Sequence, residues 1–381
     1  MTRQTVAIVG GGAAGLACAC FLDPAFYQVS IYEKNKALGR KLLVAGKGGF
    51  NLTHSEDINT LVGRYSPPQF LDQCLRQFDN EALRGWLRSI GVETYIGSSR
   101  RVFPKEGIKP IEVVKKIEAA CRVRNVEINT SYEWQGEQLA DIMIFALGGA
   151  SWSVTGSDGK WASHFANTKE FLPSNCAFHV AWPPHIVPAI EGRPLKNVVV
   201  SCAGKASAGE IMLTKFGLEG GSIYALSEAI MEQLKEINVA HIHVDLKKDL
   251  SKSQIVQKLS NTKEKTISNS IKRDLKLPKH ALVLLKEFVP KQDFLDPASL
   301  SHHIKNFSLS LSRSASLDEA ISSTGGIPSS QIDQDFALLN RDDQYVIGEM
   351  IDWNAPTGGY LLQASFSMGY FLANKLNAKH L

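Results

Sequence analysis

Apolar and polar positions near the start of the chain change period in an order typical of a strand, a turn, a helix and a second strand. Val6 to Val9 form an unbroken apolar run, which predicts a buried strand. Glycines follow this run, and the Ala- and Leu-rich segment after them predicts a helix. The segment "QVSIYEK" alternates apolar and polar residues up to Glu33 and predicts the next strand. Together these segments predict a parallel βαβ unit.

The turn of this unit has the glycine spacing of a dinucleotide-binding site. Gly10 allows a tight turn, Gly12 lets a pyrophosphate approach the backbone, and Gly15 lets the helix pack closely on the strand. Glu33 ends the second strand, where a carboxylate can accept both hydroxyls of an adenosine ribose. A carboxylate there disfavours a 2'-phosphate, so the pattern predicts NAD or FAD as the bound dinucleotide.

Two later apolar runs also predict strands that are followed by glycines. The run 142–147 predicts a buried strand that ends in two glycines. Near the C-terminus, the run 345–347 predicts another strand, and the pair Gly358-Gly359 opens an apolar helix. A helix that begins at glycines can direct N–H groups at a pyrophosphate or at a flavin. We therefore expect the two ends of the chain to meet in one nucleotide-binding domain.

The middle of the chain has a different pattern. Prolines and alternating strand-like residues follow Ala181, and "HIHVDL" predicts a further strand. Residues 251–308 contain no glycine and place apolar residues at helical spacing. We expect the following divisions of the chain: 1–185 and 326–381 for the two parts of the nucleotide-binding domain, 186–250 for a β unit, 251–308 for a helical subdomain, and 309–325 for a returning strand.

Composition narrows the classes of protein. The 381 residues are 44% hydrophobic and 21% charged, as in globular proteins, and the net charge of +4 suits anionic small molecules better than nucleic acid. Six scattered cysteines without metal-ligand spacing predict reduced thiols, a cytoplasmic location and no metal site. No apolar run is long enough to span a membrane.

The stretch 38–55, "LGRKLLVAGKGGFNLTHS", favours FAD over NAD. It follows the second strand at once and has neither a strand nor a helix period. A loop rich in glycines and cations can place N–H groups and positive charges along a pyrophosphate and bring bare backbone against a flat ring. An extended FAD needs such a loop, so we expect FAD as the cofactor.

Several further motifs resemble those of a known family. "GRKLLVAGKGGFNLT", "RRVFP", "ALGGASWSVTGSDG", "GEIMLTKFGLEGGSI", "STGGI" and "GEMIDWNAPTGGYLLQASFSMG" are similar, in this order, to motifs of the BaiN/YhiN-like NAD(P)/FAD-dependent oxidoreductases. The resemblance implies an α/β fold in which a discontinuous Rossmann-like FAD-binding domain is interrupted by a small β-barrel and a helical subdomain. Most relatives have Arg-Cys-Asn at residues 49–51 and Gly-Pro at residues 220–221, where this chain has Gly-Phe-Asn and Gly-Gly.

The resemblance and the glycine pattern together give a set of expected cofactor-binding residues. They are Gly10, Gly12, Ala13, Ala14, Gly15, Glu33, Lys34, Gly39, Arg40, Lys41, Gly46, Gly48, Gly49, Asn51, Leu52, Gly148, Gly149, Gly348, Glu349, Asp352, Gly358, Gly359 and Tyr360.

Candidate catalytic residues are fewer. The flavin itself carries hydride chemistry, so the protein must mainly position a small-molecule substrate and supply a proton. Tyr360, Arg101 and Lys105 could orient an acidic or carbonyl substrate. Cys18 and Cys20 are two apart in a predicted helix and face different ways, which disfavours a thiol relay. The chain has no second dinucleotide fingerprint, so NAD(P)H would bind transiently or without that fingerprint, and oxygen is the other candidate redox partner.

Two alternatives stay open beside an FAD-dependent oxidoreductase. One is a flavin monooxygenase, although the Gly-Asp-Ala typical of its C-terminal pyrophosphate segment is here Gly348-Glu349-Met350. The other is a non-catalytic flavin-binding protein with a nucleic-acid or protein partner. Residues 245–305 hold thirteen Lys or Arg against seven Asp or Glu, but no interleaved aromatic residues, which favours a solvated surface. The sequence does not decide the oligomeric state.

Overall fold

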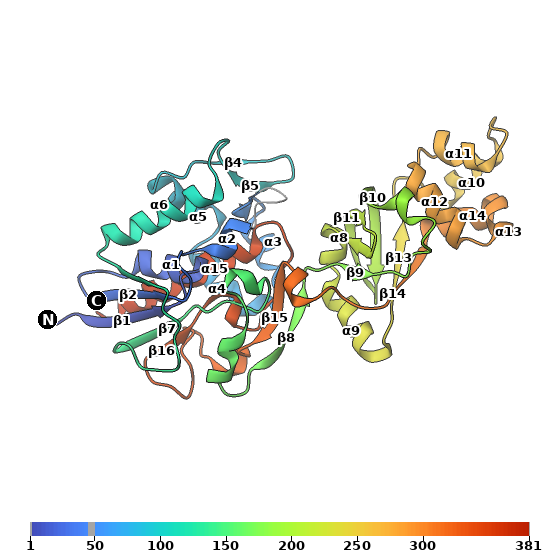
Figure 1. Ribbon diagram of the computed structural model, residues 1–381. Coiled ribbons are helices and arrows are strands. Elements are labelled where there is room, and N and C mark those ends of the chain that lie inside the picture. Colours follow the sequence, from blue (N-terminus) through green and yellow to red (C-terminus); the bar gives the residue numbers. More distant parts are fainter. Residues whose placement is uncertain (1, 45–49, 381) are drawn as a thin grey trace. The chain divides into compact units, whose positions relative to one another are not determined.

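A computed structural model describes residues 2–44 and 50–380 of the chain (Figure 1). The chain forms two compact units: one contains the residues up to Leu172 and from Ile321 onward, and the other is Pro173–Ala320. The sequence pattern predicts the inserted part at residues 186–325. The second unit starts earlier because β9 (Phe178–His179) pairs with β12 (Gly217–Glu219) of its sheet.

The first unit is built on a parallel sheet that both ends of the chain supply. Its strand order is β16-β7-β1-β2-β6, and every neighbouring pair is parallel. The strands are β1 (Gln4–Val9), β2 (Tyr27–Glu33), β6 (Glu127–Thr130), β7 (Ile142–Phe145) and β16 (Gln344–Val346). The predicted βαβ unit is confirmed, with α1 (Ala13–Phe21) joining β1 to β2. The predicted meeting of the two chain ends is confirmed by β16, which pairs with β7.

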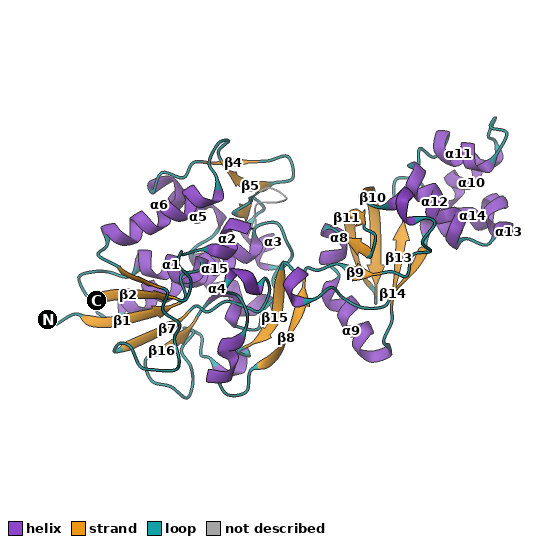
Figure 2. Ribbon diagram, in the orientation of Figure 1, coloured by secondary structure: helices purple, strands orange, loops and turns teal. Residues whose placement is uncertain are grey.

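Helices and two small sheets complete this unit (Figure 2). The helices are α2 (Arg40–Val44), α3 (Ile58–Val62), α4 (Pro68–Gln77), α5 (Asn80–Ser89), α6 (Pro110–Val123) and α15 (Tyr360–Ala378). One small sheet has the order β3 (Thr53–His54), β5 (Arg101–Pro104), β4 (Thr94–Ile96), and the other pairs β15 (Ser322–Gly326) with β8 (Lys169–Ser174). The 3-10 helices are η2 (Ser153–Thr155), η3 (Lys160–His164), η4 (Leu317–Glu319), η5 (Ser329–Gln331) and η6 (Gly348–Met350), of which η4 lies in the second unit.

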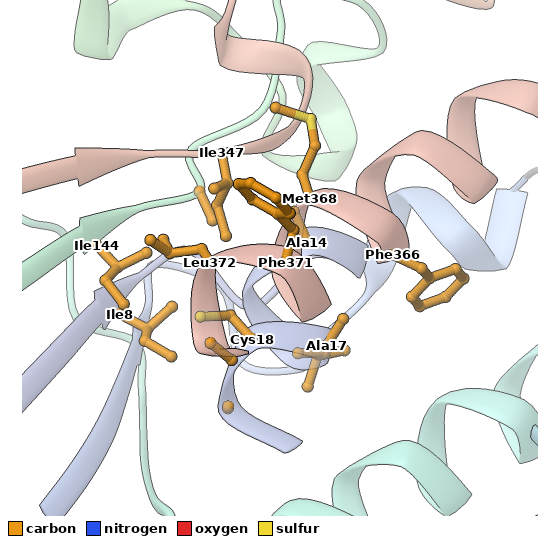
Figure 3. Packing of buried hydrophobic residues seen from close by; sticks show 14 of the residues in the cluster. Ile8, Ala14, Ala17, Cys18, Ile144, Ile347, Phe366, Met368, Phe371 and Leu372 are labelled. Carbon is orange, nitrogen blue, oxygen red and sulfur yellow. The ribbon is translucent and has the colours of Figure 1, made fainter. Parts of the chain in front are cut away.

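The core of this unit lies where α1 and α15 pack together beside the parallel sheet (Figure 3). Both helices are apolar on most sides, which is typical of helices inside a domain. Gly369 lets them approach closely, since a Cβ there would lie 2.5 Å from the Ala14 carbonyl oxygen. Close contact of these helices fixes the position of α15, and therefore of its first turn, relative to the dinucleotide-binding turn.

The second unit is a small β-barrel with attached helices. Its sheet has the order β14-β13-β10-β11-β12-β9, formed by antiparallel pairs. The chain beyond β14 returns to β9 through backbone hydrogen bonds: Ser312 N–H donates to the His179 carbonyl and His179 N–H to the Arg313 carbonyl. These bonds close the sheet on itself. The strands not yet given are β10 (Arg193–Cys202), β11 (Lys205–Leu213), β13 (Ala240–Asp245) and β14 (Phe307–Leu311).

The second unit also contains eight described α-helices. They are α7 (Val187–Ile190), α8 (Gly221–Tyr224), α9 (Ser227–Ile237), α10 (Lys252–Ser260), α11 (Ile267–Arg273), α12 (Lys279–Phe288), α13 (Lys291–Leu295) and α14 (Pro297–Lys305). Of these, α7, α8 and α9 lie within residues 186–250, where we expected a β unit. The glycine-free stretch 251–308 thus supplies α10 to α14. Among the helices of residues 2–44 and 50–380, none is both long and apolar enough to cross a bilayer.

Candidate active site

The turn between β1 and α1 has the geometry that its glycines predict. A Cβ at Gly10 would lie 2.3 Å from the Ala146 carbonyl oxygen, and one at Gly15 would lie 2.1 Å from the Gly10 carbonyl oxygen. At Gly12, by contrast, no described atom lies within 4 Å of an added Cβ. Gly10 and Gly15 are therefore required by the fold, whereas Gly12 opens onto free space in front of the helix.

Glu33 lies at the end of β2 and faces the same turn. Its Oε2 accepts a hydrogen bond from Gly11 N–H at 2.9 Å, and its Oε1 accepts from the Asn35 N–H at 2.9 Å and the Asn35 amide at 2.7 Å. These bonds orient the carboxylate and leave acceptor capacity on Oε2. Gly11 and Asn35 were not among the expected site residues, although their positions next to the glycine pattern and to Glu33 could have indicated them.

Residues from the C-terminal segment reach this turn. A Cβ at Gly348, whose φ is +82°, would lie 3.0 Å from the Ala14 Cβ. Lys41 links the two parts, since its Nζ lies 2.9 Å from Glu349 Oε2 and 2.8 Å from Ser151 Oγ. The turn, the stretch after β2 and the segment after β16 therefore form one cradle, which we call the dinucleotide cradle.

Other expected residues lie around the cradle in supporting contacts. Arg40 donates to Asn35 Oδ1 at 2.6 Å, and Lys34 pairs with Asp158 at 3.0 Å. Asp352 accepts from Gly325 N–H at 2.9 Å and from Lys169 at 2.6 Å. Gly39 N–H donates to the Gly11 carbonyl at 2.8 Å. The Gly148 carbonyl accepts from the Trp161 indole, and the Gly149 carbonyl accepts from the Ser157 hydroxyl. Ala13 lies in the first turn of α1.

The structure describes only part of the stretch 38–55. Gly46, Gly48 and Gly49 lie outside the described residues, whereas Asn51 and Leu52 lie within them. The Asn51 Nδ2 is buried and has no hydrogen-bond partner among the residues that the structure describes. A buried amide without a partner is costly, so a ligand oxygen is a reasonable acceptor for it.

A second cluster lies where α15 begins. Gly358 and Gly359 have φ values of +122° and +99°, and an added Cβ at Gly359 would lie 2.6 Å from the Thr53 backbone. At Gly358 an added Cβ would lie 3.3 Å from Tyr360 Cε2 and 3.6 Å from Arg101 Nε. The structure therefore brings Arg101 of β5 to the N-terminus of α15, next to Tyr360.

Tyr360 belongs to a polar network in which Tyr360 and Glu56 are buried and Arg64 is exposed. Its hydroxyl donates to Glu56 Oε1 at 2.8 Å, and Arg64 holds the same carboxylate with two bonds, Nε to Oε1 at 3.1 Å and Nη2 to Oε2 at 3.0 Å. The His54 ring stacks on the Tyr360 ring with centroids 5.3 Å apart, and His54 Nδ1 lies 3.6 Å from Glu56 Oε2. We call these four residues the Tyr360 network.

Protonation states in this network follow from burial and charge. Burial, reinforced by the bond to Glu56, raises the pKa of Tyr360, so its phenol stays protonated at neutral pH. Burial opposes ionisation of Glu56, but the bonds from Arg64 and Tyr360 outweigh it and lower the pKa of that carboxyl. Burial also lowers the pKa of His54, and the ring is neutral at pH 7. The network therefore combines a phenol, a carboxylate and a neutral imidazole.

Arg101 differs from Arg64 in having no acidic partner within the described part of the chain, although it is half-buried. Lys105, the third expected catalytic residue, follows the other end of β5 and is exposed. At about 3.3 Å per residue it lies roughly 13 Å from Arg101 along the strand. The structure thus brings Tyr360 and Arg101 together and leaves Lys105 apart from them.

His54, Glu56 and Arg64 were missed by the sequence reasoning. His54 was quoted only as part of the stretch 38–55, and the two charged residues follow in a segment without a recognised motif. Across residues 2–44 and 50–380, no group of three His, Cys, Asp or Glu side chains is placed to hold a metal ion.

An extended dinucleotide with a flavin fits these two sites. The open space at Gly12 and the acceptor at Glu33 suit a pyrophosphate and a ribose, and the Asn51 amide offers a buried donor. The N-terminus of the 19-residue helix α15, with Arg101 beside it, favours developing negative charge. A neutral phenol at the same place can hold or donate a proton.

Comparison with known proteins agrees with this description. The model of the family described as "HI0933-like protein Rossmann domain" matches residues 4–375. The chain is 26% identical over 402 residues to the 3-dehydro-bile acid delta(4,6)-reductase of Clostridium scindens, covering 96% of this chain and 97% of that protein. It is 22% identical over 400 residues to the ribosomal RNA dihydrouridine synthase of Haemophilus influenzae, covering 96% of each.

Solved structures are more distant. The 3-ketosteroid-delta4-(5alpha)-dehydrogenase of Rhodococcus jostii RHA1, solved in complex with 4-androstene-3,17-dione, is 12% identical with a TM-score of 0.45, over 98% of this chain and 95% of that one.

Proposed function

The chain belongs to the HI0933-like family of FAD-dependent oxidoreductases, and from that premise we propose that it reduces a carbon–carbon double bond conjugated to a carbonyl group. The names of the two relatives support this substrate class: a delta(4,6)-reductase and a dihydrouridine synthase both add hydrogen across a double bond. In a 3-oxo steroid with a Δ4 bond and in uracil alike, that bond is conjugated to a ring carbonyl.

The observation that carries the proposal is the position of Arg101. Adding a hydride to the β-carbon of a conjugated carbonyl compound moves negative charge onto the carbonyl oxygen. A cation that is half-buried, lacks an acidic partner among the described residues and lies beside the N-terminus of α15 is suited to stabilise that oxygen. Arg64 cannot take this role, because Glu56 already binds its guanidinium.

The reaction needs a hydride and a proton, and the two have separate sources. Reduced FAD, when bound, supplies the hydride. Tyr360 supplies the proton for the α-carbon, since its phenol is protonated and borders the same helix terminus; the hydroxyl leaves its hydrogen bond to Glu56 as it donates, and a solvent proton then returns to the phenolate oxygen. The Glu56 carboxylate accepts a hydrogen bond from the phenol and is itself held by Arg64, and the His54 ring covers one face of the Tyr360 ring. NAD(P)H serves as the reductant that restores the reduced cofactor. The proposal gives Lys105 no step.

Anaerobic single-turnover kinetics test this function. The reduced FAD-loaded protein is mixed with a 3-oxo-Δ4 steroid or with a uridine-containing RNA oligonucleotide, and flavin absorbance and product mass are followed. We expect one of them to reoxidise the flavin and gain two hydrogens, and the matching saturated compound to be inert. If only oxygen reoxidises the flavin, the protein is an oxidase or a monooxygenase, which peroxide or a hydroxylated product would distinguish.

A variant pair tests the role of Arg101. Arg101→Met should slow flavin reoxidation by the substrate about 100-fold while the FAD content stays near one per chain. Arg100→Met is the matched control, because Arg100 is exposed on the same hairpin and belongs to neither site. Equal rates in the two variants would remove Arg101 from the mechanism.

A further inference from the structure

The second unit contains a basic cavity that plays no part in the proposed reaction. The cavity has a volume of about 310 Å³ and lies between β10, the segment after β13 and the start of α12. This volume is at the lower end of the range of small-molecule sites. Its lining residues are Pro194, Leu195, Lys196, Asn197, Val198, Leu246, Lys247, Lys276, Leu277, Pro278 and Ala281.

The lining combines one sign of charge with apolar walls. Three lysines line the cavity, and none of its lining residues is acidic. Lys196 has one distant partner, Glu210 at 3.8 Å, whereas Lys247 and Lys276 have no acidic partner among the residues that the structure describes. Leucine, valine, proline and alanine side chains form the rest of the wall. An anionic ligand with an apolar or flat portion fits this combination.

The backbone around the cavity is shaped by a β-bulge. The register of β10 on β11 changes between Leu195 and Val198, so that Lys196 and Asn197 are not paired in the ladder. Asn197 adopts φ +58°, and its side-chain amide donates to Asp249, which ties the bulge to the segment after β13. Bulges of this kind commonly redirect side chains at binding sites.

The start of α12 forms the opposite wall. His280 in its first turn lies 2.9 Å, through Nε2, from the Pro194 carbonyl oxygen, which joins α12 to β10. Pro278 is the N-cap of this ten-residue helix, and no side chain caps it. The first N–H groups of α12 therefore add a positive dipole end to the charges of the lysines.

We propose that this cavity, lined by Lys196, Lys247 and Lys276, binds a nucleoside phosphate, with the phosphates at the lysines and the base against the apolar wall. The cavity lies wholly within the second unit and is separate from the dinucleotide cradle in the first. The inference is independent of the proposed reaction, because neither Arg101 nor the Tyr360 network takes part in it.

The test uses the full-length, FAD-loaded protein with ADP as the probe. Binding is measured by fluorescence anisotropy of etheno-ADP and by competition with ADP, adenosine and pyrophosphate. We expect ADP to compete at least about tenfold better than adenosine or pyrophosphate alone, since each retains only one half of the contacts. Pyrophosphate that competes as well as ADP, or no ADP binding at all, would overturn the proposal.

Two further measurements locate the bound ADP. ADP should protect Lys247 and Lys276 from acetylation, as seen by mass spectrometry, without releasing flavin into the filtrate. The double variant K247A/K276A should bind ADP about 100-fold more weakly, at roughly tenfold per lost charged contact. K248A is the matched control, because Lys248 is exposed, adjacent and outside the lining. Flavin release without lysine protection would place ADP in the dinucleotide cradle and refute the inference.

Discussion

Replacing Gly12 with valine should separate cofactor binding from folding in the first unit. The backbone of Gly12 has φ −81° and ψ −170°, which any residue adopts. No described atom lies within 4 Å of an added Cβ, so the Cβ of a valine has room among the residues that the structure describes. It would occupy the open space in front of α1, where we place the pyrophosphate.

The size of the effect follows from ligand linkage. At a free FAD concentration 100 times its Kd, a bound cofactor stabilises the native state by about 2.7 kcal/mol. For a unit of the size of the first one, each kcal/mol corresponds to roughly 2–4 °C in Tm, so FAD should raise the Tm of the wild-type protein by roughly 5–11 °C. Gly12→Val should abolish that increase and leave the Tm of the apoprotein within about 2 °C of wild type.

Differential scanning fluorimetry with and without FAD, together with the flavin content after gel filtration, measures both quantities. Gly15→Ala is the contrasting variant, because its Cβ would lie 2.1 Å from the Gly10 carbonyl oxygen and should lower the Tm of the apoprotein itself. Stoichiometric FAD in Gly12→Val would show that the pyrophosphate does not pass this turn. If the apoprotein Tm of Gly12→Val fell as much as that of Gly15→Ala, the valine side chain would be clashing with the protein, and the space next to Gly12 would not be open.

Three other changes test separate parts of the structure. Glu33→Arg should weaken FAD binding by at least about tenfold in a fluorescence titration, because a hydrogen-bond donor replaces the acceptor for the ribose hydroxyls. Glu33→Gln keeps an acceptor oxygen and should weaken FAD binding less. Equal FAD affinities of the two variants would contradict this prediction. Gly369→Ala should lower the free energy of unfolding by about 1–3 kcal/mol in urea titrations, because α1 and α15 lose their close contact, whereas Gly85→Ala in α5, where an added Cβ is free, should not destabilise. The pKa of Glu56 is lower in the folded state than in the unfolded state. The ionised carboxylate therefore stabilises the folded protein above the unfolded pKa of about 4.3, and this stabilisation is lost as the pH falls through the lower folded pKa. Glu56→Gln should accordingly weaken the fall of the free energy of unfolding with decreasing pH in this acidic range.

The parts of the fold that depend on neighbouring residues could be predicted from the sequence. The β1–α1–β2 unit follows from an apolar run, three spaced glycines and a terminal carboxylate within 33 residues. The strands β7 and β16 were predicted from apolar runs that end in glycine, with ends one or two residues longer than observed. Periodicity and turn chemistry act locally, and for that reason they can be read from a short segment.

The start of the second unit could not be predicted in the same way. Proline density and strand-like alternation change near Ala181, and that change suggested a start at residue 186. The unit starts at Pro173 because β9, only two residues long, pairs with β12 and with the chain beyond β14. These partners lie roughly 40 and 130 residues away, and no local pattern records a pairing at such a distance.

The Tyr360 network illustrates a different obstacle. Glu56 and Tyr360 are 304 residues apart and meet only because α15 packs on α1 and starts beside β3. Tyr360 could be selected because it follows a glycine pair, whereas Glu56 and Arg64 had no comparable signal. Charged residues are usually exposed, and only the fold shows that the Glu56 carboxylate is buried and bound by two partners.

The charges around Tyr360 distinguish this site from a purely structural network. Glu56 neutralises Arg64, which leaves the Arg101 guanidinium and the N-terminus of α15 as two positive contributions at one place. Packing alone gives no reason for that arrangement, because a half-buried cation next to a positive helix end is unfavourable without an anion. An oxygen that gains negative charge during a reaction offsets this cost only when the ligand is present. Arg101 has no acidic partner among the residues that the structure describes, which supports the anion-binding role that we propose for it, whereas Arg64, paired with Glu56, is explained by the folded structure itself.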